Sequence, residues 1–248
     1  MEITCVTTVF MKKILLRIIN FFYPVTCSCC GDDLNYMSKN RICNKCKSSF
    51  SLISGHICQK CGIPLSSGGE FCYECKKNLK HYAFDKMRSV YEYKDSVRKL
   101  ILKFKYSNRT FLAKDFAAVM YEFMENTVFY QDIDFIIPVP LNILRRIKRG
   151  YNQADLLAQE LSLKSSIPVL RNILFRNKVT RPQFKLSKAE RFKNVKNSFF
   201  VKNMEIIAGK NILLIDDIVT SSSTVSACSS VLKLHGAGRV FVLTLARD

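Results

Sequence analysis

Apolar residues recur at helical spacing in three segments after residue 90, which predicts three amphipathic helices. In residues 91–106 the pattern begins as a strand and continues as a helix, with apolar residues at i, i+3, i+4 and i+7. The stripe of that helix consists of Val97, Leu100, Ile101 and Phe104. The same spacing recurs in residues 112–126 and 153–163. Each predicted helix therefore has one apolar face to bury against another layer.

Continuous apolar runs alternate with these helices, and such runs are typical of strands that are buried on both faces of a parallel sheet. They occur at residues 135–140, 212–215 and 239–246. Parallel sheets bind ligands at the carboxyl ends of their strands. We therefore predict an α/β fold, with a parallel sheet flanked by helices and one cleft shared by the ends of the first two runs.

Residues 11–22 loosely imitate a secretory signal, but Arg17 and Asn20 interrupt the apolar run and no small-residue cleavage site follows. We expect an amphipathic helix that ends at Pro24, and Met11 is an alternative start residue. No stretch approaches the ~20 apolar residues of a membrane span. The sequence thus predicts a cytoplasmic globular protein with no membrane-spanning helix.

Eight of the eleven cysteines form four Cys-x-x-Cys pairs, separated by 12, 11 and 10 residues. One pair places two thiolates at the spacing that a tetrahedral zinc ion needs, and two pairs complete a four-sulfur site with no open position. Such closed sites are structural rather than catalytic. The predicted ligands are Cys27, Cys30, Cys43, Cys46, Cys58, Cys61, Cys72 and Cys75.

A disulfide framework is the competing interpretation of these cysteines, but no secretory signal supports an oxidising compartment. Redox chemistry at a Cys-x-x-Cys motif would use one pair rather than four in series. The sequence leaves open whether the pairs combine sequentially or in a cross-braced arrangement, and Cys29 competes as a ligand of the first site. We expect two structural zinc ions per chain.

Residues 211–224 carry the clearest chemical pattern. The apolar run leads directly into Asp216 and Asp217, and a loop rich in hydroxyl groups follows before a helical pattern begins. A strand, such a loop and a helix N-terminus together form an anion site, because free backbone N–H groups converge there. Carboxylates beside a bound phosphate suit neutral hydroxyls next to it, as on a ribose ring. A solvated Asp-Asp turn after a buried strand is the alternative.

The net charge of +19 favours polyanionic partners such as nucleic acid, a phosphorylated small molecule or an anionic membrane surface. A basic proteome background is the alternative explanation. Residues 171–202 contain ten Lys or Arg and one acidic residue, with phenylalanines between them. This composition suits single-stranded nucleic acid, and equally a mobile lid over a pyrophosphate. It also suits phenylalanines that serve only in packing.

Residues 211–224 resemble the phosphoribosyl pyrophosphate (PRPP) motif of type I phosphoribosyltransferases. The resemblance implies that Asp216 and Asp217 hold the ribose hydroxyls and that magnesium accompanies PRPP. It also implies that the 5′-phosphate is cradled by Thr220, Ser221, Ser222, Ser223 and Thr224. Where the family pattern has glycine, this chain has Ser222, and serine does not freely adopt the positive φ that glycine allows.

From residue 22 to residue 248 the chain resembles ComF-type competence proteins, in which a double zinc ribbon precedes a phosphoribosyltransferase-like domain. The matching pieces are residues 23–27, 103–106, 138–141, 149–154, 180–183 and 191–195, together with the Asp-Asp loop. The resemblance implies domains at 22–78 and 85–248, and a pyrophosphate loop formed by Pro138, Val139, Pro140 and Leu141. It also implies a flexible basic loop within 176–196, with the candidate residues Arg181, Gln183, Lys185, Lys188 and Arg191.

This resemblance implies a role in DNA uptake or a related nucleic-acid pathway, and two hypotheses follow. The first is a magnesium-dependent PRPP-binding phosphoribosyltransferase, whose acceptor and catalytic base the sequence does not identify. The second is a non-catalytic adaptor that binds single-stranded DNA beside a helicase or other DNA-uptake proteins, with the pocket reduced to a phosphate site. The Asp216–Asp217 pair favours the first hypothesis, whereas Ser222 and the net charge favour the second.

Overall fold

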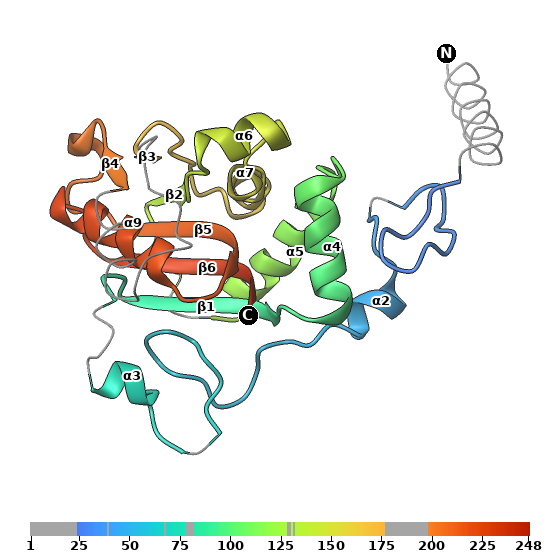
Figure 1. Ribbon diagram of the computed structural model, residues 1–248, viewed down its shortest axis with the longest axis horizontal. Coiled ribbons are helices and arrows are strands. Elements are labelled where there is room, and N and C mark those ends of the chain that lie inside the picture. Colours follow the sequence, from blue (N-terminus) through green and yellow to red (C-terminus); the bar gives the residue numbers. More distant parts are fainter. Residues whose placement is uncertain are drawn as a thin grey trace, which may run out of the picture. The chain divides into compact units, whose positions relative to one another are not determined.

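Figure 1 shows the computed structural model, which describes residues 24–38, 40–66, 68–77, 82–127, 130, 132–176 and 198–248. The helix expected at residues 11–22 and the five candidate residues of the flexible loop lie outside the described residues. The chain divides into two compact units between residues 50 and 51.

The first unit folds around four of its cysteines. An antiparallel bridge joins Thr26 to Asp33, and the short helix α2 (Asn44–Ser48) follows Cys43. The Cys43 side chain caps this helix by accepting a hydrogen bond from the Cys46 N–H at 3.4 Å. In the described part of this unit few apolar side chains are buried, so these local bonds contribute much of what holds the chain around the cysteines.

In the second unit, four of the described strands form one parallel sheet in the order β1-β6-β5-β2. Their bounds are β1 (Lys86–Glu92), β2 (Phe135–Pro138), β5 (Ile212–Val219) and β6 (Val240–Arg247). The register places Leu214 of β5 between Ile137 of β2 and Val242 of β6. All eight residues of β6 are buried, as expected for a central strand with helices on both faces.

The helices cover the sheet on both faces (Figure 1). Helix α9 (Ser223–Leu234) connects β5 to β6 and packs against both strands, whereas α5 (Leu112–Glu125) and α7 (Gln153–Ser165) pack together. The crossover from β5 to β6 runs toward β1, and the crossover from β1 to β2 through α4 (Asp95–Tyr106) and α5 runs the opposite way. Right-handed crossovers in opposite directions lie on opposite faces of a sheet. This places α9 on one face and α5 with α7 on the other.

The three predicted helices form with the predicted faces inward. In α4 the buried residues are Val97, Leu100, Ile101 and Phe104. In α7 the apolar residues Ala154, Leu157, Ala158 and Leu161 are buried. The parallel sheet, its helical layers and the cysteine groups confirm the predicted fold class.

Residues 51–61 run along the outer edge of β1. The Ile53 N–H donates to the Val90 carbonyl at 2.9 Å, and the Met87 N–H donates to the Lys60 carbonyl at 2.8 Å. An uncovered edge strand would present unpaired backbone groups to solvent. The segment that leads into the second cysteine group therefore protects the edge of the sheet and is part of the same compact unit.

Strand β5 extends beyond the predicted apolar run, because β6 continues beside it. Asp216 pairs with Thr244 and Ile218 with Ala246 in the parallel register. Both carboxylates consequently lie within the strand rather than in a turn after it. This backbone pairing rigidly positions the two acidic side chains.

The basic stretch after residue 170 contains an antiparallel hairpin that the apolar pattern does not predict, formed by β3 (Leu174–Arg176) and β4 (Phe199–Val201). Phe175 and Phe200 stack across it with ring centroids 5.3 Å apart. These phenylalanines thus serve in packing. The remaining short elements are α3 (Tyr73–Lys76), α6 (Ile143–Arg149) and η3 (Met204–Ile206). In the described part of the chain, no helix has the length and apolar character needed to cross a membrane.

Candidate functional site

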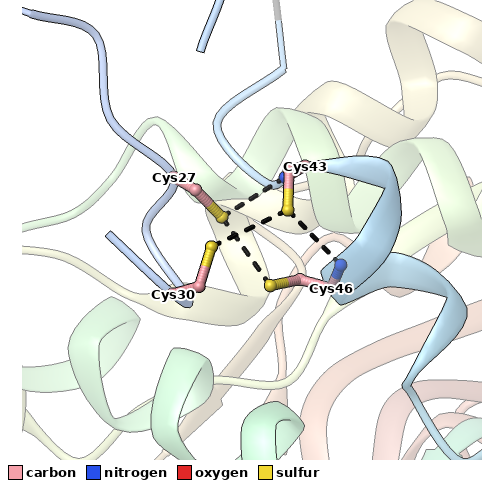
Figure 2. Close-up of side chains that lie close together, drawn as sticks. All are labelled: Cys27, Cys30, Cys43 and Cys46. Atoms are coloured by element: carbon pink, nitrogen blue, oxygen red, sulfur yellow. Dashed lines mark hydrogen bonds between the residues drawn. The ribbon is translucent and has the colours of Figure 1, made fainter. Parts of the chain in front are cut away.

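Two groups of four cysteines bring their sulfur atoms together, with the four atoms of each group within 4.8 Å of one another. The first group, shown in Figure 2, consists of Cys27, Cys30, Cys43 and Cys46. The second consists of Cys58, Cys61, Cys72 and Cys75. The Sγ–Sγ distances are 3.9 Å for Cys27–Cys46, 3.8 Å for Cys30–Cys43 and 3.8 Å for Cys61–Cys72. Tetrahedral zinc with Zn–S bonds of about 2.3 Å separates its sulfur ligands by ~3.8 Å, so both groups fit zinc.

The first four cysteines of the motif pairs form one group and the last four form the other. The two ribbons are therefore sequential and not cross-braced. Cys29 lies outside the first group, and its N–H donates to Cys27 Sγ at 3.4 Å. The Cys43 N–H donates to the same sulfur at 3.3 Å. Donors of this kind stabilise a thiolate, which is the form that binds zinc.

Two buried arginines of the sheet hold the second cysteine group. Arg88 of β1 donates to the Cys58 carbonyl at 3.3 Å, and Arg247 of β6 donates to the Cys61 carbonyl at 2.6 Å. A zinc ion bound by four thiolates carries a charge of about −2, and nearby guanidinium groups offset it. The second zinc site is thus continuous with the core of the α/β unit, whose buried apolar cluster includes Cys58 and Cys61.

A cavity of about 180 Å³, here called the main cavity, opens where β2 and β5 end. Four cationic side chains line it, namely Lys105, Arg145, Arg149 and Arg176. The carboxylates that line it are Asp216 and Asp217. This excess of positive charge around two hydrogen-bond acceptors suits a ligand that combines anionic groups with hydroxyls.

The two carboxylates have different surroundings. Asp217 Oδ1 lies 3.0 Å from Lys105 Nζ, and the two side chains are only 9% and 15% exposed. The Asp217 N–H donates to Asp216 Oδ1 at 2.8 Å. Burial, reinforced by the neighbouring Asp217 charge, raises the pKa of the Asp216 carboxyl from 3.8 to about 7, although this hydrogen bond and the charges of Lys105 and Arg176 oppose the shift. These surroundings therefore favour the protonated form of Asp216 relative to a solvent-exposed aspartate.

The hydroxyl-rich loop surrounds a smaller hollow of about 50 Å³, the loop hollow, between the end of β5 and the start of α9. Ser222 adopts the left-handed conformation, with φ 58° and ψ 3°, and its carbonyl accepts the first helical hydrogen bond from Ser226 N–H at 2.9 Å. The N–H groups of the first turn of a helix have no partner within the helix. The loop hollow is consequently lined by hydroxyl groups and backbone donors, and Asp216 lines it as well.

The segment after β2 forms the other wall of the main cavity. The Val139 N–H donates to the Ile215 carbonyl at 2.9 Å and thereby continues the β2–β5 ladder. Asn152 Nδ2 donates to the Val139 carbonyl at 3.0 Å, and Arg149 donates to Gln153 Oε1 at 3.0 Å. Gln153 is buried, yet among the described residues its Nε2 has no hydrogen-bond partner. It is therefore a donor that a ligand could satisfy.

Arg176, the last residue of β3, brings a fourth cation to the main cavity. Its guanidinium packs over the Phe199 ring at 5.4 Å, and its Nε lacks a hydrogen-bond partner among the described residues. Burial lowers the pKa of this guanidinium. A buried donor next to a carboxylate and an empty volume is well placed for an anionic group.

Six of the residues that the family resemblance implicates line the main cavity, namely Val139, Pro140, Leu141, Asp216, Asp217 and Thr224. The whole loop from Thr220 to Thr224 lines the loop hollow. Pro138 is the last residue of β2 and lines neither volume. Arg181, Gln183, Lys185, Lys188 and Arg191 lie outside the described residues.

The sequence did not single out several side chains that line the main cavity. Lys105, Arg149, Asn152 and Gln153 fall within the matching pieces 103–106 and 149–154, but those pieces carried no assigned role. Arg176 is the first residue of the flexible loop expected at 176–196 but was not among its candidate residues, and Arg145 fell in none of the matching pieces. For Arg145 and Arg149 the sequence did contain a signal, because both residues closely follow the predicted strand at 135–140. The carboxyl ends of parallel strands are where such a sheet binds its ligands.

Comparisons with known proteins show which proteins this chain is similar to. Residues 18–76 match a family model described as a double zinc ribbon domain. Competence protein F of Haemophilus influenzae is 33% identical over 91% of this chain and 98% of its own length. The DNA utilization protein YhgH of Shigella flexneri is 31% identical over 83% of this chain and 90% of its own length.

Among solved structures, glutamine phosphoribosylpyrophosphate amidotransferase from B. subtilis overlays on 58% of this chain and 30% of its own, with 17% identity and a TM-score of 0.40.

Proposed function

The chain belongs to the ComF-type family of competence and DNA utilization proteins, and from that membership we propose that its main cavity and loop hollow bind PRPP together with magnesium. In this proposal the protein is a phosphoribosyltransferase-like component of DNA uptake or of a related nucleic-acid pathway. Two zinc ribbons support its fold.

The observation that carries the proposal is the convergence of three kinds of group on one volume. Asp216 lines both the main cavity and the loop hollow, and Asp217 lines the main cavity together with the four cationic side chains. A phosphorylated ribose with a diphosphate on its C1 has hydroxyls between two anionic ends. The loop hollow suits the 5′-phosphate, the carboxylates suit the ribose hydroxyls, and the cations suit the diphosphate.

Magnesium fits the donor set of the main cavity. This ion is commonly held by one or two carboxylates together with substrate phosphates and water. Asp216 and Asp217 supply the carboxylates, and the proposed ligand supplies the diphosphate. Because Asp217 is already paired with Lys105 at 3.0 Å, Asp216 is the carboxylate more open to a metal-bound water or a ribose hydroxyl.

In a transfer reaction the bond between C1 of the ribose and the diphosphate oxygen would break, and an acceptor nucleophile would bond to C1. Bound magnesium would supply neutralisation of the diphosphate leaving group. The side chains of Lys105, Arg149 and Arg176 would hold that leaving group and offset its charge. The acceptor would provide the electron pair for the new bond and lose its proton to solvent.

The direct test is calorimetric titration of the zinc-loaded protein with Mg·PRPP, comparing the parent with Asp216→Asn. Asparagine has the shape of a protonated aspartic acid, but it cannot make the charge-assisted hydrogen bonds, each worth roughly 1.5–3 kcal/mol. We expect affinity to fall about tenfold or more, since ~1.4 kcal/mol is one decade. Asp132→Asn is the matched control, because Asp132 is exposed and pairs with Arg239 away from the cavity.

The control should bind Mg·PRPP like the parent, and both variants should keep their zinc. If the parent fails to bind Mg·PRPP at millimolar concentration, or if Asp216→Asn binds it equally well, the PRPP proposal is wrong.

A second candidate function is a single-stranded DNA adaptor, favoured by the net charge of +19 and by helix α6. Four of the seven residues of this helix are basic, and none of its residues is buried. In that case DNA binding would persist in Asp216→Asn, because α6 carries the charge independently of the carboxylates. Retained DNA affinity without PRPP affinity in the parent protein would favour the adaptor.

A further inference from the structure

Arg247, the last residue of β6, connects the second cysteine group with the end of β5. It is 8% exposed, and its side chain donates to the Cys61 carbonyl at 2.6 Å. Its backbone lies opposite Val219 in the parallel register, and the Asp248 N–H donates to the Val219 carbonyl at 3.0 Å. Val219 immediately precedes the hydroxyl-rich loop, residues 220–224, and lines the loop hollow. One buried arginine is therefore bonded to a cysteine turn and lies beside the start of this loop.

An apolar cluster makes the same connection independently. Cys58 and Cys61 of the second group are buried in one cluster with Val219 and Val225. These two valines flank the hydroxyl-rich loop, and both line the loop hollow. Side chains packed at the density of a protein interior transmit small displacements to their neighbours. A change in the shape of the cysteine turn would thus reach both ends of the loop.

Zinc bound by the second group would fix the position of the Cys61 carbonyl. The Sγ atoms of Cys61 and Cys72 lie 3.8 Å apart, which suits zinc, and a turn that folds around a metal is held only while the metal is bound. Without zinc, the carbonyl would be free to move away from Arg247. A buried guanidinium that loses its partner is costly, so Arg247 and the end of β6 would have to move as well.

We propose that Arg247 is a positioning residue that couples the second zinc site to the loop hollow. Zinc in the second group keeps the loop in its binding conformation, and a bound ligand in turn retains the zinc, because coupling between sites is reciprocal. The inference rests on the proposed function, since it concerns regulation of the same site. The first cysteine group lies in the other compact unit, so its zinc takes no part.

The first experiment uses the full-length, zinc-loaded parent protein and needs no variant. Release of the two zinc ions to a zinc-selective chromogenic chelator is followed without ligand and with saturating Mg·PRPP. We expect the ligand to slow the release of one zinc by about fivefold or more, as for typical coupling between sites. Release of the other zinc should not change, and it is the internal control for chelation by PRPP itself. The slowed phase should persist in Cys30→Ser, which loses a ligand of the first group.

Variants of the two buried arginines test the route. Arg247→Met removes the hydrogen bond to Cys61 and keeps an unbranched side chain. Arg88→Met is the matched control, because Arg88 donates to the Cys58 carbonyl of the same turn at 3.3 Å but lies on β1, which β6 separates from β5. We expect the protection of zinc by Mg·PRPP to fall to about twofold or less in Arg247→Met and to remain in Arg88→Met. Arg247→Lys keeps a charge and a donor and should restore most of the protection.

The outcomes distinguish this inference from the proposed function. If the parent binds Mg·PRPP but the ligand slows neither zinc, or slows both equally, the inference is wrong and the proposed function stands. If Arg247→Met and Arg88→Met lose protection to the same extent, the route through Arg247 is wrong. If the parent does not bind Mg·PRPP, both proposals fail. The parent experiment decides the coupling even if Arg247→Met does not fold.

Discussion

Asp216 and Asp217 are adjacent and identical in chemistry, yet their neighbours give them different properties. Asp217 is paired with Lys105 at 3.0 Å, whereas burial beside another carboxylate raises the pKa of Asp216 to about 7. A carboxyl with a raised folded-state pKa keeps its proton between pH 4 and 7, where the unfolded chain has already lost it. The unfolding free energy is therefore highest below this range and falls as the pH rises through it.

We predict opposite pH dependences for stability and for binding at this residue. Relative to Asp216→Asn, the parent should lose stability as the pH rises from 5 to 8, because only the parent must ionise a carboxyl whose pKa is raised by folding. Over the same range the parent should gain affinity for Mg·PRPP relative to the variant, by up to about tenfold per pH unit below 7. Urea melts and calorimetry at pH 5, 6, 7 and 8 measure both quantities.

Taking the ratio of parent to variant cancels the titration of the ligand's own phosphates. Ratios that stay flat from pH 5 to 8 would show that Asp216 is already ionised at pH 5.

Among the elements, the two cysteine turns differ in what surrounds them. Gly31 and Gly62 each follow a Cys-x-x-Cys pair, and each donates its N–H to the carbonyl of the first cysteine at 2.9 Å. Both have positive φ, 88° and 68°. A Cβ on Gly31 would meet open space, but a Cβ on Gly62 would lie 2.6 Å from the Met87 carbonyl oxygen. The turn at Gly62 therefore packs closely against β1, whereas the turn at Gly31 has no such neighbour.

We predict that Gly62→Ala destabilises the α/β unit and that Gly31→Ala does not. Both variants incur a positive-φ penalty of about 1–2 kcal/mol, but only Gly62→Ala must also push the turn away from β1, at a further ~1–3 kcal/mol. Circular dichroism melts and zinc release to a chelator measure the effects. The parent should contain two zinc ions, and Gly62→Ala should release one of them faster than the parent does.

Gly31→Ala is the matched control, because it has the same local turn without the contact to the sheet. Equal losses of Tm in the two variants would contradict a structural link between the second ribbon and the sheet.

For the whole molecule, the question is where the excess positive charge acts. Helix α6 buries none of its apolar residues, since Ile143, Leu144 and Ile147 are all exposed. Its basic residues divide into two pairs. Arg145 and Arg149 line the main cavity, whereas Arg146 and Lys148 do not. One short helix therefore supplies cations both to the proposed PRPP site and to the outer surface.

We predict that single-stranded DNA binding, measured by fluorescence anisotropy at several salt concentrations, depends on the outer pair. Each phosphate contact contributes ~0.7 to the slope of log affinity against log salt concentration. Arg146→Ala combined with Lys148→Ala should flatten this slope by about 1.4, with Mg·PRPP affinity retained. Lys114→Ala with Lys164→Ala removes the same charge from exposed positions on α5 and α7, and should have a smaller effect.

If both double variants change the slope equally, DNA responds to net charge alone and α6 is not a specific surface.

The sequence alone determined the features that depend on local spacing. The apolar stripe of α4 follows from helical periodicity, because a helix brings residues to one face at fixed intervals. The buried strand β6 follows from a continuous apolar run, which is typical of a strand covered on both faces. The four Cys-x-x-Cys pairs likewise indicate zinc, because each pair supplies two ligands within one turn. The Asp-Asp loop was recognisable because a strand, a hydroxyl loop and a helix are contiguous in the chain.

Only the tertiary structure decided which distant residues meet. Lys105 reaches Asp217 from α4, and Arg176 reaches the same cavity from a hairpin that no periodic pattern predicts, since its strands have three residues each. Sequential cysteine pairing was decided in the same way, by the positions of the sulfur atoms. The conformation of Ser222 also depended on tertiary context, because spacing cannot show that a loop holds a serine in the left-handed region. Local periodicity specifies which face of an element is buried, but the charges and contacts of a site arise from elements that the chain brings together only on folding.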